Sequence, residues 1–136
     1  MRVVLDASVA VAALIRPRGW TAAQLARSDV EWYIPTFLLD ELEDHLREFA
    51  GMADVSPSTL RLRIESLRSK RMVTDERMKP HHDDPIVRQA ATIDPDDAPY
   101  LAAVLAVRAD YLWTRDKELF AAFPTLAVRV VPLSAP

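Results

Sequence analysis

The chain begins with a short apolar run, Val3-Val4-Leu5, that ends directly in the carboxylate of Asp6. Consecutive apolar and β-branched residues are typical of a strand that is buried on both faces of a parallel sheet. Ser8, followed by the apolar segment 9–15, predicts a helix with Ser8 as its N-cap. Asp6 is therefore expected at the carboxyl end of a strand, where open parallel sheets bind ligands. A charged side chain there needs a partner such as a metal ion, unless Asp6 only caps the next helix.

Length and composition limit the classes of protein to consider. With 136 residues, half of them hydrophobic, residues 1–136 are expected to form a single domain with one core. The absence of cysteine excludes disulfides, thiolate nucleophiles and Cys-ligated zinc. Two glycines, Gly19 and Gly51, are too few for a P-loop or a GxGxxG turn. No apolar run approaches the roughly 20 residues that cross a bilayer, and no signal segment opens the chain, so we expect a cytoplasmic protein.

The charges are separated along the chain. The net charge is -3, but segment 61–79 carries seven basic residues against three acidic ones, and segment 81–97 carries five aspartates against one arginine. A basic face beside an acidic pocket suits a metal-dependent enzyme that acts on a polyanion. The alternative is that each arginine belongs to an ordinary solvated helix face.

Apolar periodicity predicts an alternation of strands and helices. Strands are expected at 3–5, 31–34, 72–74, 111–114 and 128–131, and helices at 9–15, 21–28, 37–49, 58–71, 86–93 and from 98 onward. The pair Asp84-Pro85 is a helix-start signal, which we favour over a metal site at His81-His82. This order predicts an α/β fold with three layers, α/β/α, around a central, mainly parallel sheet of four or five strands.

Four carboxylates fall where such a sheet would bring them together. Asp6 and Asp116 follow two strands, Glu41 borders the apolar stripe of a helix near its start, and Asp97 stands at the start of another helix. The carboxyl ends of parallel strands share one edge, so these groups are expected to converge. Clustered carboxylates repel one another, and a hard divalent cation, Mg²⁺ or Mn²⁺, would relieve the repulsion.

The motifs carry a family resemblance that spans nearly the whole chain. An opening VVLDAS, a helix after Pro35 that bears Glu41, and the segment DPDDAPYLAAVLAVRADYLWTRDKEL together resemble a PIN domain, the nuclease family that includes the VapC toxins. The resemblance implies Asp6, Glu41, Asp97 and Asp116 as the catalytic and metal-binding residues, with Asp96 as the alternative to Asp97. It also implies Ser8 and Thr114 as supporting polar groups.

The resemblance also implies an activity and partners. The expected reaction is endonucleolytic hydrolysis of RNA with Mg²⁺ or Mn²⁺, giving a 5'-phosphate and a 3'-hydroxyl. A small antitoxin protein and a homodimer are the expected assemblies. Basic residues are candidates for contacts with the RNA backbone, namely Arg115, Lys117, Arg68 and Arg71.

Other classes remain as alternatives. A haloacid-dehalogenase-type phosphotransferase needs a second aspartate where this chain has Ser8, and a receiver domain needs an acidic pair where Asp6 stands alone. Both differences disfavour these two classes. A free-standing RNA-processing nuclease and a catalytically quiet PIN-like binding module remain open. The three tryptophans, Trp20, Trp32 and Trp113, are expected in the core.

Overall fold

A computed structural model describes residues 1–128 and shows one sheet whose strands all run parallel. The strands are β1 (Arg2–Leu5), β2 (Glu31–Pro35), β3 (Arg71–Val73), β4 (Tyr111–Trp113) and β5 (Ala127–Val128). Their order across the five-stranded sheet is β3-β2-β1-β4-β5, with Val4 opposite Tyr33 on one side and Leu112 on the other. The α/β prediction with a parallel central sheet is confirmed.

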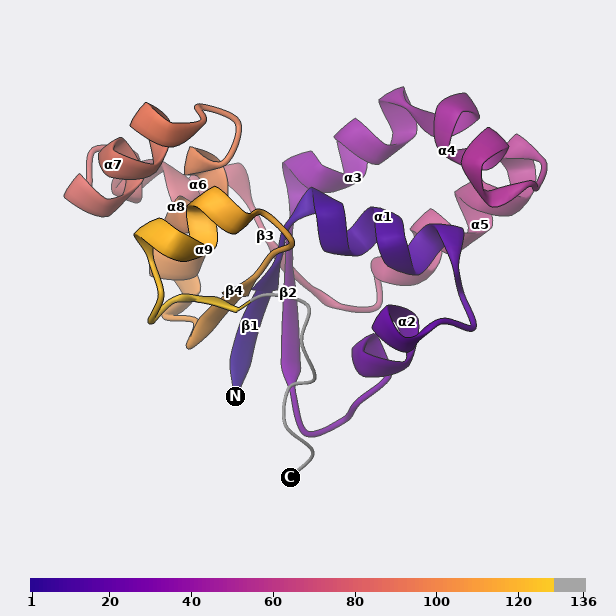
Figure 1. The fold of residues 1–136 in the computed structure, drawn as a ribbon, viewed down its shortest axis with the longest axis horizontal. Coiled ribbons are helices and arrows are strands. Elements are labelled where there is room, and N and C mark those ends of the chain that lie inside the picture. Colours follow the sequence, from indigo (N-terminus) through magenta and orange to yellow (C-terminus); the bar gives the residue numbers. More distant parts are fainter. Residues whose placement is uncertain (129–136) are drawn as a thin grey trace.

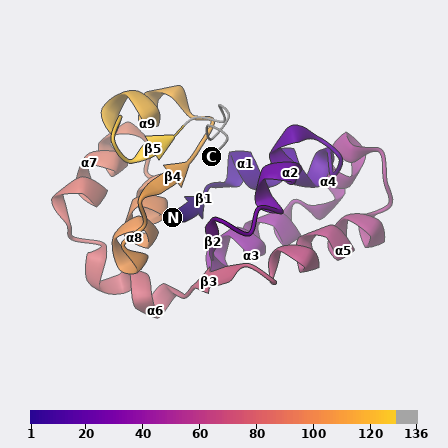
Figure 2. The same cartoon turned by 90° about the horizontal axis from the view of Figure 1, so that it is seen from below.

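Helices cover both faces of this sheet and make three layers (Figure 1). On one side lie α1 (Ala7–Ile15), α2 (Trp20–Leu25), α3 (Thr36–Asp44), α4 (Leu46–Ala53) and α5 (Pro57–Leu67). On the other side lie α6 (Asp75–Met78), the 3-10 turn η1 (Lys79–His81), α7 (Pro85–Ile93), α8 (Ala98–Val107) and α9 (Lys117–Ala122). Figure 2 shows the same division from below. Within residues 1–128, none of the helices has the length and apolar character that a bilayer span requires.

The core lies between the sheet and its helices. The central strands β1 and β4 are almost completely buried, and α8 lies against them with its small and apolar residues, among them Leu101 and Val104. A helix that is apolar on nearly all sides must be enclosed on nearly all sides. This packing fixes the start of α8, and therefore Asp97, relative to the end of β1.

Two details of the helices differ from the prediction. Helix α1 begins at Ala7, and its N-cap is Asp6 instead of Ser8, because the Asp6 carboxylate accepts the backbone N–H of Val9. The segment predicted as one helix over 37–49 is two helices, since the backbone of His45 leaves helical geometry with φ -108° and ψ 23°. The break lets α4 turn toward α1 and α5.

The remaining predicted elements differ mainly in their ends. Helix α2 spans 20–25 instead of 21–28, and β3 spans 71–73 instead of 72–74. Helix α5 spans 57–67 instead of 58–71, with Ser56 as its N-cap. The capping prediction for Asp84 is confirmed, because its carboxylate accepts the backbone N–H of Ile86 at 2.9 Å. The last strand is described at Ala127–Val128, and the rest of the predicted strand 128–131 lies outside the described residues.

One of the three tryptophans is not in the core. Trp32 and Trp113 are 3% and 0% exposed, as predicted, whereas Trp20 is 41% exposed. Trp113 already stacks on Trp32 with 5.3 Å between ring centroids, and Trp20 contacts Trp113 edge to face at 5.9 Å. The prediction that Trp20 is buried was therefore wrong, because the sequence does not show that two other rings already fill the space beneath it.

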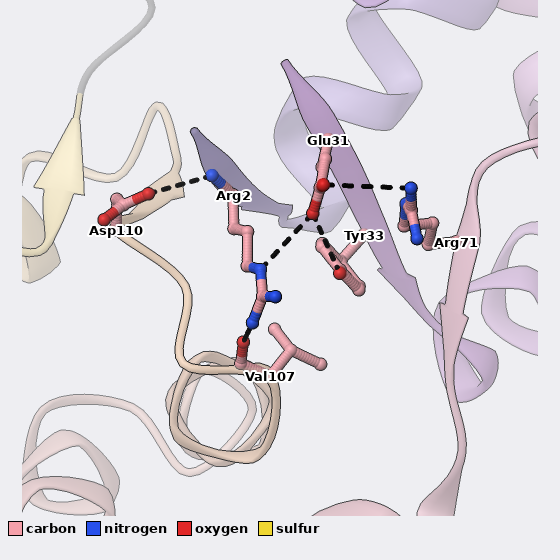
Figure 3. A network of polar contacts seen from close by, with 6 residues as sticks. All are labelled: Arg2, Glu31, Tyr33, Arg71, Val107 and Asp110. Carbon is pink, nitrogen blue, oxygen red and sulfur yellow. Dashed lines mark hydrogen bonds and ion pairs between the residues drawn. The ribbon is translucent and has the colours of Figure 1, made fainter.

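Charged residues at the amino ends of the strands are paired with one another (Figure 3). The Glu31 carboxylate lies 3.3 Å from Nε of Arg2 and 3.8 Å from Nη2 of Arg71, and it accepts the Tyr33 hydroxyl at 3.2 Å. The Asp110 carboxylate accepts the backbone N–H of Arg2 at 2.9 Å. At this edge each carboxylate has a donor or a cation within the protein.

Candidate active site

The opposite edge of the sheet holds an acidic pocket. Asp6 directly follows β1, Asp97 precedes α8, and Asp116 precedes α9, and all three line an open pocket of about 390 Å³. The other lining residues are Ala7, Ser8, Tyr100 and Arg115. Residues that are as far as 110 positions apart in the sequence thus meet at one place, because parallel strands bring their carboxyl ends to one edge.

Asp6 is the most enclosed of the three carboxylates, with 4% of the residue exposed. Its Oδ1 accepts the Ser8 hydroxyl at 2.6 Å and the Val9 backbone N–H at 3.1 Å, and its Oδ2 accepts the Thr114 hydroxyl. Burial raises the pKa of Asp6, and these hydrogen bonds oppose the shift because they favour the charged form. The carboxylate is therefore held in one orientation at the wall of the pocket.

Ser8 and Thr114 join Asp6 to the loop that follows β4. The Ser8 hydroxyl oxygen accepts the backbone N–H of Arg115 at 3.1 Å, and the Thr114 hydroxyl oxygen accepts the backbone N–H of Asp116 at 3.0 Å. Each hydroxyl thus donates to Asp6 and accepts from the loop. The two residues thus connect Asp6 with the loop that carries Asp116.

Asp116 is held by the helix that it precedes. Its Oδ1 accepts the backbone N–H groups of Glu118 and Leu119 at 2.9 and 3.2 Å, as an N-cap of α9. These bonds involve one carboxylate oxygen, so Oδ2 has no bond to the helix. Asp116 is therefore both a cap and a pocket residue, and the cap fixes its direction.

Asp97 has a carboxylate oxygen that lacks a hydrogen-bond partner. Its Oδ2 is buried and has no hydrogen-bond partner among residues 1–128. Burial raises the pKa of Asp97 to about 7, together with proton sharing with the Asp116 carboxyl group and the negative charges of Asp116, Asp94 and Asp6. A carboxylate that has one buried oxygen without a partner and lies among other carboxylates is stabilised by either a proton or a cation.

Glu41 lies beside this pocket and not in its lining. The side chain is exposed on α3, one helical turn after Phe37, whose ring contacts Tyr100 at 5.0 Å between centroids. Residues four apart lie on one helix face, so Glu41 is on the face of α3 that meets α8. Partial burial raises the pKa of Glu41, and the negative charge of Asp96 raises it further. Of the four carboxylates predicted to converge, the structure places Asp6, Asp97 and Asp116 in the pocket lining and Glu41 beside the pocket.

Tyr100 is a pocket residue that the sequence analysis did not single out. It is 3% exposed, and its hydroxyl is buried without a hydrogen-bond partner in the described part of the chain, although the Ala7 backbone N–H lies near it. Burial raises the pKa of this hydroxyl, and the charge of Glu41 adds to the effect. Its position three residues after Asp97, on the same face of the first turn of α8, is the signal that identifies it.

The other predicted site residues are divided between the pocket and distant surfaces. Arg115 lines the pocket, and Lys117 is exposed at the start of α9. Asp96 is exposed and outside the pocket lining, with its backbone N–H bonded to the Asp94 carboxylate at 2.9 Å. Arg68 pairs with Glu65 beyond the end of α5, and Arg71 lies at the amino-end edge of the sheet. The structure does not bring these last two arginines to the pocket.

The chemistry of the pocket fits a hard divalent cation. Its acidic lining residues are Asp6, Asp97 and Asp116, with one unpartnered oxygen on Asp97, and Arg115 also lines the pocket. Oxygen donors without sulfur or imidazole suit Mg²⁺ or Mn²⁺. Within residues 1–128, no three acidic or histidine side chains already stand at the spacing of a formed metal site. The donors therefore fit in kind, and their side chains would have to move closer together to complete the coordination.

Comparison with known proteins assigns the family. The model of the PIN domain family matches residues 4–132, so the chain belongs to the PIN domain family. A chain in the crystal structure of VapBC2 from Rickettsia felis, bound to a DNA fragment from their promoter, superposes with a TM-score of 0.69. That similarity covers 95% of this chain and 98% of the other at 14% sequence identity, which establishes the likeness of fold. No curated protein matches this chain in sequence.

Proposed function

We propose that this protein is a divalent-metal-dependent endoribonuclease that hydrolyses phosphodiester bonds in RNA. The observation that carries the proposal is the convergence of Asp6, Asp97 and Asp116 on one pocket, without a protein cation paired to any of them among residues 1–128. PIN domains are generally nucleases, which supports the same class of activity.

Asp6, Asp97 and Asp116 would hold the ion, with Glu41 at the margin of the site. A bound Mg²⁺ or Mn²⁺ ion lowers the pKa of water and stabilises charge on the phosphate and the leaving oxygen. In the overall reaction, a water oxygen bonds to phosphorus, the bond to the 3' oxygen breaks, and that oxygen takes a proton. No side-chain nucleophile is needed.

The protein's own contribution is positioning. Ser8 and Thr114 hold Asp6 by donating to its two oxygens, and the α9 N–H groups hold Asp116 through one oxygen. Preorganised ligands lose little conformational freedom when the substrate arrives, which favours a rigid site on strand ends. Arg115 lines the same pocket and supplies a positive charge for a phosphate oxygen.

The direct test is cleavage of an end-labelled single-stranded RNA by the purified protein. We expect cleavage with Mn²⁺ or Mg²⁺, none in EDTA, and loss of more than about 100-fold in Asp6→Asn and Asp116→Asn, since supporting groups alone cost about 10- to 100-fold. Each asparagine keeps the cap geometry, so both variants should remain folded. Full activity in EDTA would reject the proposal.

We further propose that the nuclease is the cytoplasmic toxin of a toxin–antitoxin pair and acts as a homodimer. The supporting observation is the likeness of fold to a chain of VapBC2. Expression of the protein alone should arrest growth, and co-expression of a small protein encoded beside it should restore growth. Growth that continues in spite of active nuclease would favour a free-standing RNA-processing enzyme.

A further inference from the structure

A second hollow adjoins the acidic pocket. It has a volume of about 520 Å³ and is lined by the end of α1, the start of α2, Met52 of α4, and Arg115 from the loop after β4. Arg115 lines both hollows, so the two form neighbouring parts of one surface. The catalytic proposal uses only the acidic part.

An exposed aromatic ring stands in this second hollow. Trp20 lines it and is 41% exposed, while its ring rests edge to face against the buried Trp113. Trp113 is fixed in turn by stacking on Trp32. An exposed indole that is held in position by a buried aromatic pair loses little freedom when another ring stacks on it.

The turn before Trp20 brings Arg16 to the same hollow. Residues 16–19 form a tight turn closed by a hydrogen bond from the Gly19 N–H to the Arg16 carbonyl oxygen at 2.9 Å. A Cβ at position 19 would stand 3.1 Å from Cβ of Arg16, so glycine permits this close approach. Arg16 therefore lines the same hollow as Trp20.

The hollow carries positive charge that the protein does not neutralise. Arg16 and Arg115 have no carboxylate partner among residues 1–128, in contrast to Arg61, Arg68 and Arg71. Helix α1 separates Arg16 from Asp6 by about 15 Å, at 1.5 Å per residue, which is a distance that a few nucleotides span. Unpaired cations and an exposed aromatic ring are the combination that binds single-stranded nucleic acid.

We infer that this hollow is a binding subsite for single-stranded RNA, in which a base stacks on Trp20 and the adjoining phosphates contact Arg16 and Arg115. The inference rests on the proposed nuclease function and adds the path of the strand beside the acidic pocket. A base on Trp20 would hold the neighbouring part of the strand so that a phosphate lies over Asp6, Asp97 and Asp116. Stacking is tolerant of sequence, so this subsite favours unpaired strands over a particular base.

The test is direct binding of an unstructured oligoribonucleotide of about ten nucleotides, in Ca²⁺, with the strand checked to be intact afterwards. Trp32 and Trp113 are buried, so quenching of tryptophan fluorescence by a stacked base reports Trp20. We expect quenching in the wild type. In the variants, which lack this indole, the Kd comes from the fluorescence anisotropy of an end-labelled oligoribonucleotide, and it should rise about tenfold or more in Trp20→Leu and less in Trp20→Phe, which keeps a ring.

Two arginines that flank Pro17 provide a matched pair. Arg16 lines the hollow, whereas Arg18 is exposed and outside its lining. Arg16→Ala should weaken binding and reduce the slope of log K against log salt by about 0.7, as the loss of one phosphate contact requires. Arg18→Ala should leave both unchanged. Thermal melting of each variant separates a loss of binding from a loss of folding.

The outcomes separate this inference from the proposed function. Metal-dependent cleavage with a wild-type KM in Trp20→Leu and Arg16→Ala would overturn the subsite and leave the nuclease proposal intact. Binding that needs Trp20 and Arg16, without cleavage in any metal, would support the subsite and reject the nuclease. Binding of RNA with unchanged tryptophan emission would assign the hollow to another class of partner, such as a protein segment, and overturn the inference.

Discussion

The carboxylates at the two edges of the sheet differ in the partners that the protein gives them. At the amino ends of the strands, Glu31 lies between Arg2 and Arg71, and Asp110 accepts a backbone N–H. At the carboxyl ends, Asp6 accepts hydroxyl hydrogen bonds and Asp116 accepts backbone hydrogen bonds, while Oδ2 of Asp97 has no partner. None of these three pocket residues has an ion pair within residues 1–128. The carboxylates at the amino ends have partners within the protein, whereas those at the carboxyl ends need a proton or a cation to balance their charge. We call the first the structural edge and, following the proposed function, the second the functional edge.

Asparagine substitutions at the two edges should give the largest contrast. Asp97→Asn removes a ligand of the proposed ion and should lower kcat/KM by more than about 100-fold, since loss of a supporting group alone costs about 10- to 100-fold. Asp110→Asn keeps an oxygen that can accept the Arg2 N–H, and activity should stay within about twofold of wild type. Metal-dependent cleavage rates measure both. Equal losses of activity in Asp97→Asn and Asp110→Asn would contradict the distinction between the two edges.

Removal of a supporting hydroxyl should have a smaller effect on the functional edge. Thr114→Val keeps the shape of the side chain but removes the donor to Asp6 and the acceptor for the Asp116 N–H. We expect a loss of about 10- to 100-fold in activity and in Mn²⁺ affinity. Mn²⁺ titration and rate measurements on the same preparation test this. Unchanged affinity with reduced rate would place Thr114 in a role other than positioning Asp6 and Asp116.

The pH dependence of stability should follow the raised pKa values of the acidic edge. The unfolded chain loses the Asp97 proton near pH 4, whereas the folded protein in EDTA holds it until about pH 7, so the free energy of unfolding falls as pH rises between these values. The raised pKa of Asp6 acts in the same direction. Melting temperatures at about pH 5 and pH 8 measure the effect. In Asp97→Asn the melting temperature should change less between these two pH values. A pH dependence equal to that of the wild type would contradict the assignment of this effect to Asp97.

The smallest effect is expected at the structural edge. Glu31→Gln removes two exposed ion pairs, which are worth less than about 1 kcal/mol each, and keeps an acceptor for the Tyr33 hydroxyl. The free energy of unfolding from a urea titration should change by about that amount, with no change in cleavage rate. A loss of activity in Glu31→Gln would show that the two edges are coupled.

Much of the acidic edge follows from the sequence because strand ends in a parallel sheet share a direction. The apolar runs that precede Asp6 and Asp116 define strand ends, and the small-residue helix after Asp97 must pack against those strands. These local signals suffice to bring distant carboxylates together.

Other features depend on tertiary packing and carry no local signal. The break at His45 occurs without glycine or proline, and it is accompanied by the packing of α4 on α1 and α5. The exposure of Trp20 depends on Trp113 and Trp32 filling the space below it. The distance of Arg68 and Arg71 from the pocket depends on where α5 ends and β3 begins. Composition alone suggested that the basic segment 61–79 faces the substrate, but composition does not show which way the side chains of a segment point.

The proposed metal site is best tested with a crystal of the wild-type protein soaked in Mn²⁺, with the ion located by anomalous scattering. We expect an anomalous peak at the carboxyl edge of the sheet, with oxygens of Asp6, Asp97 and Asp116 as protein ligands and Asp97 Oδ2 among them. An Mn²⁺ ion bound only outside this pocket, or a pocket that stays without metal at saturating Mn²⁺ near pH 8, would contradict this expectation.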